Sequence, residues 1–269
     1  MTRTNPDQMY HETSREMVLA HFSMRHATFD QRAHAAAAAG FDGIGLFVGA
    51  YLAALRDGAD DDALLAALAA HGTRVLELEA LPFFNDQVLD IMVGLAERFG
   101  ARRIQTVAPF SGSLDHAAAA TWLADAADRV AAFGTSLAIE FLPFTAIATA
   151  HDASELIERA DRPNVGMCVD SWHVFRGAGI ESLADLTPEH VFSIQLNDGP
   201  IQPVLDDYVQ DCLHHRQVMG EGEFDLGALM AMLPAEAPVS IEVPDDDLDL
   251  LDPGEVARRL ADATRALLA

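Results

Sequence analysis

Four polar residues, each at or near the end of a short apolar run, have the side chains needed to bind a metal ion. They are Glu140 in SLAIE, Asp170 in VGMCVD, Gln195 in VFSIQL and Glu242 in VSIEV. Each run is typical of a buried β-strand, where an unpartnered carboxylate would cost several kcal/mol. Oxygen ligands suit hard cations, so the four side chains would bind one divalent ion if they converge. The ordinary alternative is that each one faces polar groups of a nearby loop.

The elements that would bring these residues together are strands and helices in alternation. Strands are predicted over residues 17–23, 43–47, 74–80, 103–108, 136–141, 165–170, 191–196 and 239–243, with a long loop over 197–224. Helices are predicted over 29–39, 51–56, 61–70, 86–99, 115–133, 153–160, 180–185, 225–233 and 253–268. Alternating strands and helices predict a parallel sheet covered by helices, and eight such units favour a closed (β/α)8 TIM barrel. An open doubly wound sheet is the alternative, but no G-x-G-x-x-G follows the first strand.

The predicted organisation is a single barrel domain over residues 17–269, preceded by an N-terminal extension over residues 1–16. No linker or change in composition divides the chain. The four polar residues would follow consecutive strands, the fifth to the eighth, on one side of the barrel. The long loop 197–224 would lie at the same end, where barrel enzymes have their active sites.

The composition narrows the class of protein. The chain of 269 residues has 42 acidic and 17 basic residues, a net charge of −25, which disfavours nucleic acid and anionic membranes as partners. It lacks an apolar segment of the ~18 residues that a membrane span needs. Two cysteines, Cys168 and Cys212, do not make a disulfide scaffold. We therefore expect a cytoplasmic protein, and alanine-rich faces such as residues 117–120 are compatible with a homodimer.

The motifs around these residues resemble those of the xylose isomerase-like barrels, the sugar phosphate isomerase/epimerase group. The resemblance covers nearly the whole chain from Met17. It rests on Ile139-Glu140, Asp170-Ser-Trp-His173, Gln195-Leu-Asn-Asp198, Gly220-Glu-Gly222 and Glu242. It implies a TIM barrel that binds one divalent metal ion through Glu140, Asp170, Gln195 and Glu242.

The same resemblance implies the roles of individual side chains. Glu140 and Glu242 would exchange protons with the substrate, and His173 and Arg216 would contact its oxygen atoms. The family most often has histidine where this chain has Gln195. An all-oxygen set of ligands favours Mn²⁺ or Mg²⁺ over Zn²⁺, with Co²⁺ as a further option. Glutamine at this position also resembles some 3-dehydroshikimate dehydratases.

The resemblance and the implied roles of these residues together predict an isomerase or epimerase that acts on a small keto or aldo polyol through an enediolate. A lyase of the same fold, such as a dehydratase of a cyclic keto polyol, is the alternative. A repair endonuclease of this fold is disfavoured, because it would need more histidine ligands and a basic surface. A non-catalytic sugar-binding barrel is also disfavoured, because it would not need two proton-transfer glutamates. Because no glycine-rich loop with lysine occurs, we expect a substrate without a phosphate group.

Overall fold

Eight parallel strands form a closed barrel in sequence order in the computed structural model, which describes residues 15–269. The strands are β1 (Met17–Leu19), β2 (Gly43–Phe47), β3 (Val75–Pro82), β4 (Arg103–Val107), β5 (Ser136–Glu140), β6 (Val165–Asp170), β7 (Val191–Leu196) and β8 (Val239–Ile241). Because β1 pairs with both β2 and β8, the sheet has no free edge. The predicted (β/α)8 barrel is confirmed.

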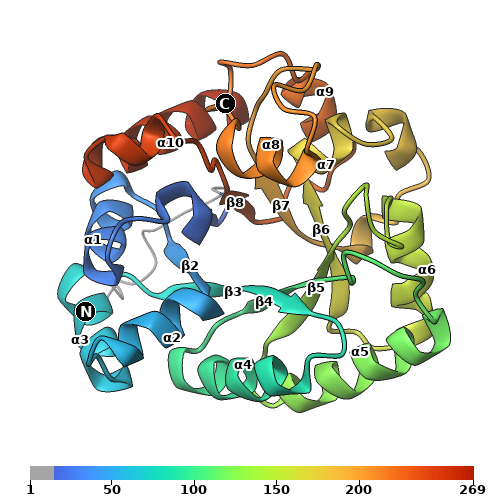
Figure 1. The fold of residues 1–269 in the computed structure, drawn as a ribbon, viewed down its shortest axis with the longest axis horizontal. Coiled ribbons are helices and arrows are strands. Elements are labelled where there is room, and N and C mark those ends of the chain that lie inside the picture. The colour runs from blue at the N-terminus through green and yellow to red at the C-terminus, as the bar shows by residue number, and fades with distance from the viewer. Residues whose placement is uncertain (1–14) are drawn as a thin grey trace, which may run out of the picture.

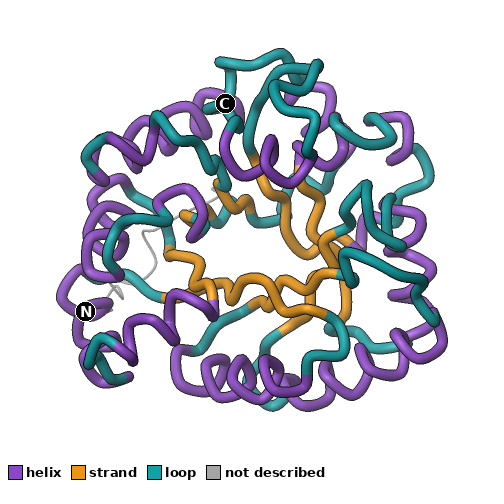
Figure 2. Tube along the Cα trace, viewed as in Figure 1, coloured by secondary structure: helices purple, strands orange, loops and turns teal. Residues whose placement is uncertain are grey.

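Helices surround the barrel on the outside (Figures 1 and 2). They are α1 (Phe29–Ala39), α2 (Val48–Arg56), α3 (Asp61–His71), α4 (Asp86–Phe99), α5 (His116–Ala131), α6 (Ala150–Ala160), α7 (Ser171–Phe175), α8 (Tyr208–His214), α9 (Leu226–Met232) and α10 (Pro253–Leu268). Short 3-10 helices are η2 (His21–Met24), η3 (Ile180–Leu183), η4 (Pro188–His190) and η5 (Leu248–Leu250). Their apolar faces and the outward side chains of the strands form the main core. Among the described helices, none is long and apolar enough to cross a membrane.

Local sequence signals set the ends of many helices. Thr28 and Gln31 form a reciprocal capping box at the start of α1, which ends at Gly40 with φ +79°. Helix α4 likewise ends at Gly100 with φ +66°. Glycine adopts this left-handed conformation at little cost because it has no Cβ atom, so Gly40 and Gly100 fix the points at which the two helices end.

Several segments differ from the prediction. Helix α7 lies where no helix was predicted, and the predicted helix 180–185 is the 3-10 helix η3. The predicted first strand, residues 17–23, ends at Leu19 and continues as η2, because the Ser23 hydroxyl donates to the Ile241 carbonyl at 2.8 Å and draws the chain across the end of β8. The predicted loop 197–224 contains helix α8, whose start is capped by Asp207. The extension predicted over 1–16 falls mainly on residues outside the described range, and β1 begins at Met17.

The barrel interior is polar as well as apolar. Glu77 on β3 accepts from Arg103 at 2.9 Å and from Gln105 at 3.5 Å, both on β4. Gln195 on β7 donates to Gln105 at 3.4 Å. Strands β4 and β7 are not neighbours, so this last contact crosses the inside of the barrel. Side chains therefore fill the barrel, and a substrate can enter only at its ends.

The close approach of β2 to β3 generates a prediction about stability. A Cβ atom at Gly45 would lie 1.7 Å from Oε1 of Glu79. We expect Gly45→Ala to lower the free energy of unfolding by about 2 kcal/mol or more, as overpacking does. Gly94→Ala is the control, because Gly94 is exposed within α4 and meets nothing within 4 Å. It should raise stability by roughly 0.5 kcal/mol. Urea denaturation of both variants would measure the difference, and equal effects would contradict it.

Candidate active site

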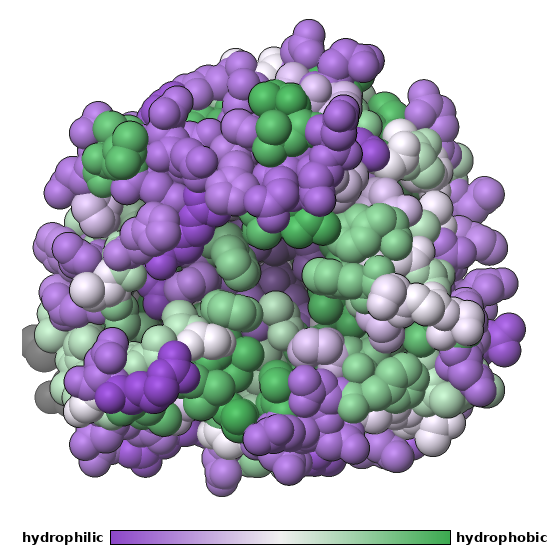
Figure 3. All heavy atoms as spheres, viewed as in Figure 1, coloured by the Kyte–Doolittle hydropathy of each residue, from purple (hydrophilic) through white to green (hydrophobic). Residues whose placement is uncertain are grey.

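The predicted site residues meet at the carboxyl ends of β5 to β8. A cavity of about 240 Å³ opens there, and Glu140, His173, Arg216 and Glu242 supply its polar lining. The rest of the wall is apolar and is formed by Phe22, Ala80, Val107, Phe110, Leu142, Phe144, Val209, Cys212, Leu213 and Pro244. Figure 3 shows the face that carries α8, with a hollow near its middle and hydrophobic residues on part of the rim. The cavity thus has a polar floor and an apolar wall.

On one side of the polar floor, Glu140 and His173 lie next to Asp170, which does not itself line the cavity. The Nε2 atom of His173 lies 3.0 Å from Oε1 of Glu140 and 4.0 Å from Oδ2 of Asp170. One ligand atom of each of the three residues falls within 4.8 Å of the other two. The Nδ1 atom of His173 lies 2.8 Å from the Tyr208 hydroxyl on α8, which fixes the orientation of the imidazole ring.

The other half of the floor is built around Arg216. Its Nη1 atom donates to Oδ2 of Asp170 at 2.8 Å and to Oε2 of Glu242 at 3.0 Å. Its Nε atom donates to the Cys212 carbonyl at 3.1 Å, and its Nη2 atom contacts the Cys212 thiol at 3.0 Å. Asp170 is shared by both halves, and its Oδ1 atom accepts from the Trp172 amide and from Asn197. The side chain of Asp170 is therefore held on every side.

The pKa values of Glu242 and Asp170 are shifted in opposite directions, although both groups are buried. Burial raises the pKa of Glu242 well above its ordinary value, and the charges of Glu140 and Asp170 act in the same direction against Arg216. Burial also opposes ionisation of Asp170, but Arg216, His173 and Asn197 together lower its pKa. Asp170 is thus held as the carboxylate, while the environment favours a proton on Glu242.

Gln195 lies beside Asp170 in the pairing of β6 with β7. It is fully buried, and its Oε1 atom accepts from the Cys168 thiol at 3.3 Å. The hydrogen bonds of its amide within the described chain go to Cys168 and Gln105, away from the carboxylates. The structure therefore brings together Glu140, Asp170, His173, Arg216 and Glu242 directly, and it places Gln195 next to this group.

The Gly220-Glu-Gly222 motif shapes the loop that carries Arg216. Asp198 accepts from the backbone amides of Gly199, Gly220 and Phe224 at 2.8, 2.9 and 3.0 Å. A Cβ atom at Gly222 would lie 2.3 Å from Asp198, so only glycine fits there. The motif closes the loop 197–224 over the barrel end.

Several buried polar residues beside the site were missed from the sequence. Glu79 on β3 accepts from the His21 amide at 2.8 Å, and its Oε2 atom has no hydrogen-bond partner among the described residues. Arg32 on α1 contacts Nδ1 of His21. Burial raises the pKa of Glu79 to about 8. The pattern E-L-E at residues 77–79, with both glutamates on one face of an apolar strand, is a sequence signal that could have found it.

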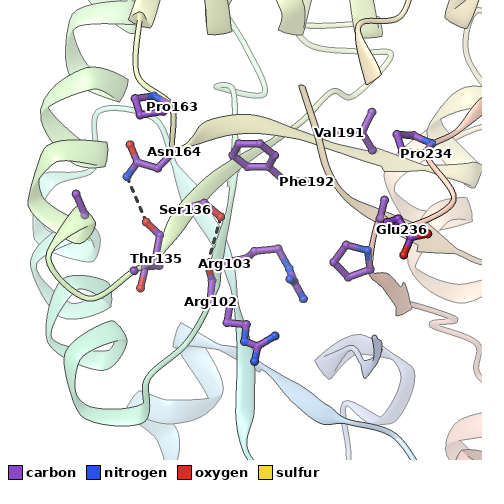
Figure 4. Close-up of a pocket in the computed structure, with 14 residues that line it drawn as sticks. Arg102, Arg103, Thr135, Ser136, Pro163, Asn164, Val191, Phe192, Pro234 and Glu236 are labelled. Carbon is purple, nitrogen blue, oxygen red and sulfur yellow. Dashed lines mark hydrogen bonds between the residues drawn. The ribbon is translucent and has the colours of Figure 1, made fainter. Parts of the chain in front are cut away.

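A second cavity, of about 730 Å³, lies at the opposite end of the barrel (Figure 4). Its wall includes the starts of β4, β5 and β7, with Arg102, Arg103, Ser136, Asn164 and Phe192. The hydrogen bonds drawn there join Asn164 to Thr135 and Ser136 to Arg102. Arg102 and Arg103 also pair with Glu16. Glu236 is the one acidic residue among those that line this cavity.

The donor set at the carboxyl ends fits a divalent cation. Glu140, Asp170 and Glu242 bring three carboxyl groups together, of which Asp170 and Glu242 are buried and directly contact the guanidinium of Arg216. Carboxylate oxygens and an imidazole nitrogen are ordinary ligands of Mn²⁺, Mg²⁺ and Zn²⁺. The excess of acidic groups over basic ones gives a cation a physical reason to bind here.

The raised pKa of Glu79 predicts how stability depends on pH. The folded value of about 8 lies above the unfolded value of about 4.3, so the folded state holds more protons in between. Stability should therefore fall as the pH rises from about 5 through 8. In Glu79→Gln the neutral amide removes this loss. The free energy of unfolding of the variant, relative to wild type, should rise by about 1 kcal/mol or more between pH 6 and pH 9.

Urea denaturation at both pH values would measure this difference, and Glu189→Gln, at an exposed position, is the control. A difference between Glu79→Gln and wild type that does not change with pH would contradict the assignment.

Comparison with known proteins places the chain among enzymes of this fold. A 3-dehydroshikimate dehydratase from Pseudomonas aeruginosa is 33% identical over 125 residues, which are 45% of this chain and 19% of that protein. An inosose isomerase from Bacillus subtilis is 29% identical over 114 residues, 41% of this chain and 40% of that protein. The chain thus matches less than half of the length of either curated relative.

A solved structure of the IolI protein with a bound zinc atom matches 94% of this chain and 98% of its own, with a TM-score of 0.81 and 19% identity. At this identity the likeness shows the fold. The model of the family described as the xylose isomerase-like TIM barrel matches residues 33–267. With its closed eight-stranded barrel, the chain therefore belongs to the xylose isomerase-like TIM barrel family.

Proposed function

We propose that this chain is a divalent-metal-dependent isomerase or epimerase of a small keto or aldo polyol. The observation that carries the proposal is the convergence of Glu140, Asp170, His173 and Glu242 on one cavity with a polar floor. The inosose isomerase that the chain resembles is consistent with this activity. Glu140, Asp170 and Glu242 would hold the metal ion, with Gln195 as a further ligand, and Mn²⁺ or Mg²⁺ is the proposed ion.

The residues divide the work of proton transfer. A bound divalent ion would polarise the carbonyl group of the substrate and acidify the neighbouring C–H bond. Glu242 takes or returns the proton, since its side chain lines the cavity in which the substrate would lie. Glu140 acts as the second proton-transfer group, and His173, oriented by Tyr208, donates to a substrate oxygen. Return of the proton to the other face of the carbon gives an epimer, and return to the adjacent carbon gives an isomer.

The charges that line the cavity favour a neutral substrate. Arg216 is the lining cation of the cavity, apart from any charge on His173, and it is already paired with Asp170 and Glu242. A phosphate group would therefore meet carboxylates and aromatic rings rather than a free guanidinium or ammonium group. This supports an unphosphorylated polyol as substrate.

A dehydratase is the second candidate, because the chain is 33% identical over 125 residues to a 3-dehydroshikimate dehydratase. The first step would be the same removal of a proton next to a carbonyl group. Loss of a β-hydroxyl group would then follow in place of proton return. The two reactions can be separated by whether the product retains all the oxygen atoms of the substrate.

The isomerase or epimerase activity can be tested in D₂O. The protein is incubated with Mn²⁺ and unphosphorylated keto polyols, which include inososes and ketohexoses. We expect NMR to show deuterium at the carbon next to the carbonyl group, and Glu242→Gln should reduce this rate by about 100-fold or more. Glu189→Gln is the control, because Glu189 is an exposed acid outside the cavity. A Glu242→Gln variant with full turnover would contradict the role of Glu242. Rising ultraviolet absorbance with 3-dehydroshikimate, without deuterium in any polyol, would favour the dehydratase.

Metal binding can be tested separately from turnover. Asp170→Asn removes one negative charge from the buried floor and keeps the size of the side chain. We expect it to weaken Mn²⁺ binding by about tenfold or more, because a carboxylate ligand becomes a neutral amide. Isothermal titration calorimetry would measure both proteins, again with Glu189→Gln as the control. Equal affinities, or no binding by the wild type, would contradict the proposed metal site.

A further inference from the structure

Arg216 lies between two of the carboxylates that the proposed function assigns to the metal ion. A single nitrogen atom, Nη1, contacts Oδ2 of Asp170 at 2.8 Å and Oε2 of Glu242 at 3.0 Å. The side chain of Arg216 is buried, and so are both carboxyl groups. In this arrangement the guanidinium neutralises charge that would otherwise be costly to bury.

A metal ion and this nitrogen cannot occupy the same position. A divalent ion bonds to carboxylate oxygens at about 2.0–2.4 Å. An ion bonded to both Oδ2 of Asp170 and Oε2 of Glu242 would lie between these atoms, where Nη1 lies now. The positive charges of the ion and the guanidinium would also repel each other in a buried region. Binding through this oxygen pair therefore requires the guanidinium to leave.

The surroundings of Arg216 allow this movement. Arg216 is among the residues that line the cavity, so open space adjoins this residue. Its other side-chain contacts are to the backbone carbonyl of Glu242 at 3.2 Å, to the carbonyl group and thiol of Cys212, and to the ring of Trp172, whose centroid lies 5.7 Å away. The thiol is a weak acceptor, so one of these contacts is easily exchanged.

We propose that Arg216 competes with the divalent cation, acting as the counter-ion of Asp170 and Glu242 when no metal is bound and moving into the cavity when one is. This inference rests on the proposed metal site. It adds that metal affinity is set by the exchange of one buried cation for another.

Replacement of Arg216 by methionine gives the direct test. The variant keeps much of the side-chain volume and removes the competing charge. We expect isothermal titration at pH 8 to show Mg²⁺ binding tighter than in wild type by about tenfold or more, because the ion no longer displaces a charge-assisted pair of hydrogen bonds. The pH is chosen to limit competition from protons on the freed carboxyl groups. Unchanged or weaker binding would overturn the proposal.

The chain offers a matched control in Arg176→Met. Arg176 is also buried, lies over the same Trp172 ring at 4.7 Å, and pairs with a buried carboxylate, Asp211, at 2.6 Å. Asp211 is not among the residues that line the cavity. Loss of Arg176 should leave Mg²⁺ affinity unchanged. Tighter binding in both variants would trace the effect to general loosening and overturn the specific role of Arg216.

A measurement on wild-type protein is independent of how well the variant folds. In ¹⁵N-arginine-labelled protein, the Nε–Hε group of Arg216 is protected by its bond to the Cys212 carbonyl. Saturating Mg²⁺, which is diamagnetic, should shift this NMR signal and speed its exchange with water. A signal that does not change while calorimetry shows Mg²⁺ bound would overturn the competition alone. Failure of both wild type and Arg216→Met to bind any divalent ion would overturn the metal site and this inference together.

Discussion

The arrangement of the barrel end depends on how three neighbouring carboxyl groups, two of them buried, are kept from repelling one another. Glu140, Asp170 and Glu242 come from the ends of β5 and β6 and from the residue after β8, and ionising all of them away from water would be costly without positive charge. Arg216 supplies that charge in the structure. The guanidinium can reach this position only because the segment after β7 folds back over the barrel, held by Asp198 and helix α8.

The same constraint prepares the site for proton transfer. Arg216 is shared by Asp170 and Glu242, and the surroundings of these two acids differ, so the pKa of Asp170 is lowered and that of Glu242 is raised. Two carboxyl groups with separated proton affinities are what a reaction needs if one group must hold charge and another must accept and return a proton. The apolar wall of the cavity strengthens each of these interactions by excluding water.

The sequence predicted those parts of the site that local pattern determines. An apolar run that ends in an acid shows both the strand and the end at which its carboxylate lies, so the barrel, Glu140, Asp170 and Glu242 could be placed. The sequence predicts a loop where α8 lies, because the seven residues of this helix mix polar and apolar types without a clear period. The partners of Arg216 lie 46 and 26 residues away in sequence, and no local pattern encodes such contacts. Metal ligation by Gln195 stays a prediction.

The polar floor by itself does not decide which reaction follows proton removal. The proposed epimerisation, isomerisation and dehydration would all begin by weakening a C–H bond next to a carbonyl group, and the same carboxyl groups would serve each of them. The outcomes differ in which carbon or hydroxyl group lies near a proton donor afterwards. That position depends on how the ring or chain of the substrate rests against Phe22, Phe110 and Phe144, which come from η2 and from the segments that follow β4 and β5. Within this family, we therefore expect the loops of the apolar wall to separate isomerases from dehydratases, while the carboxylates of the floor stay the same.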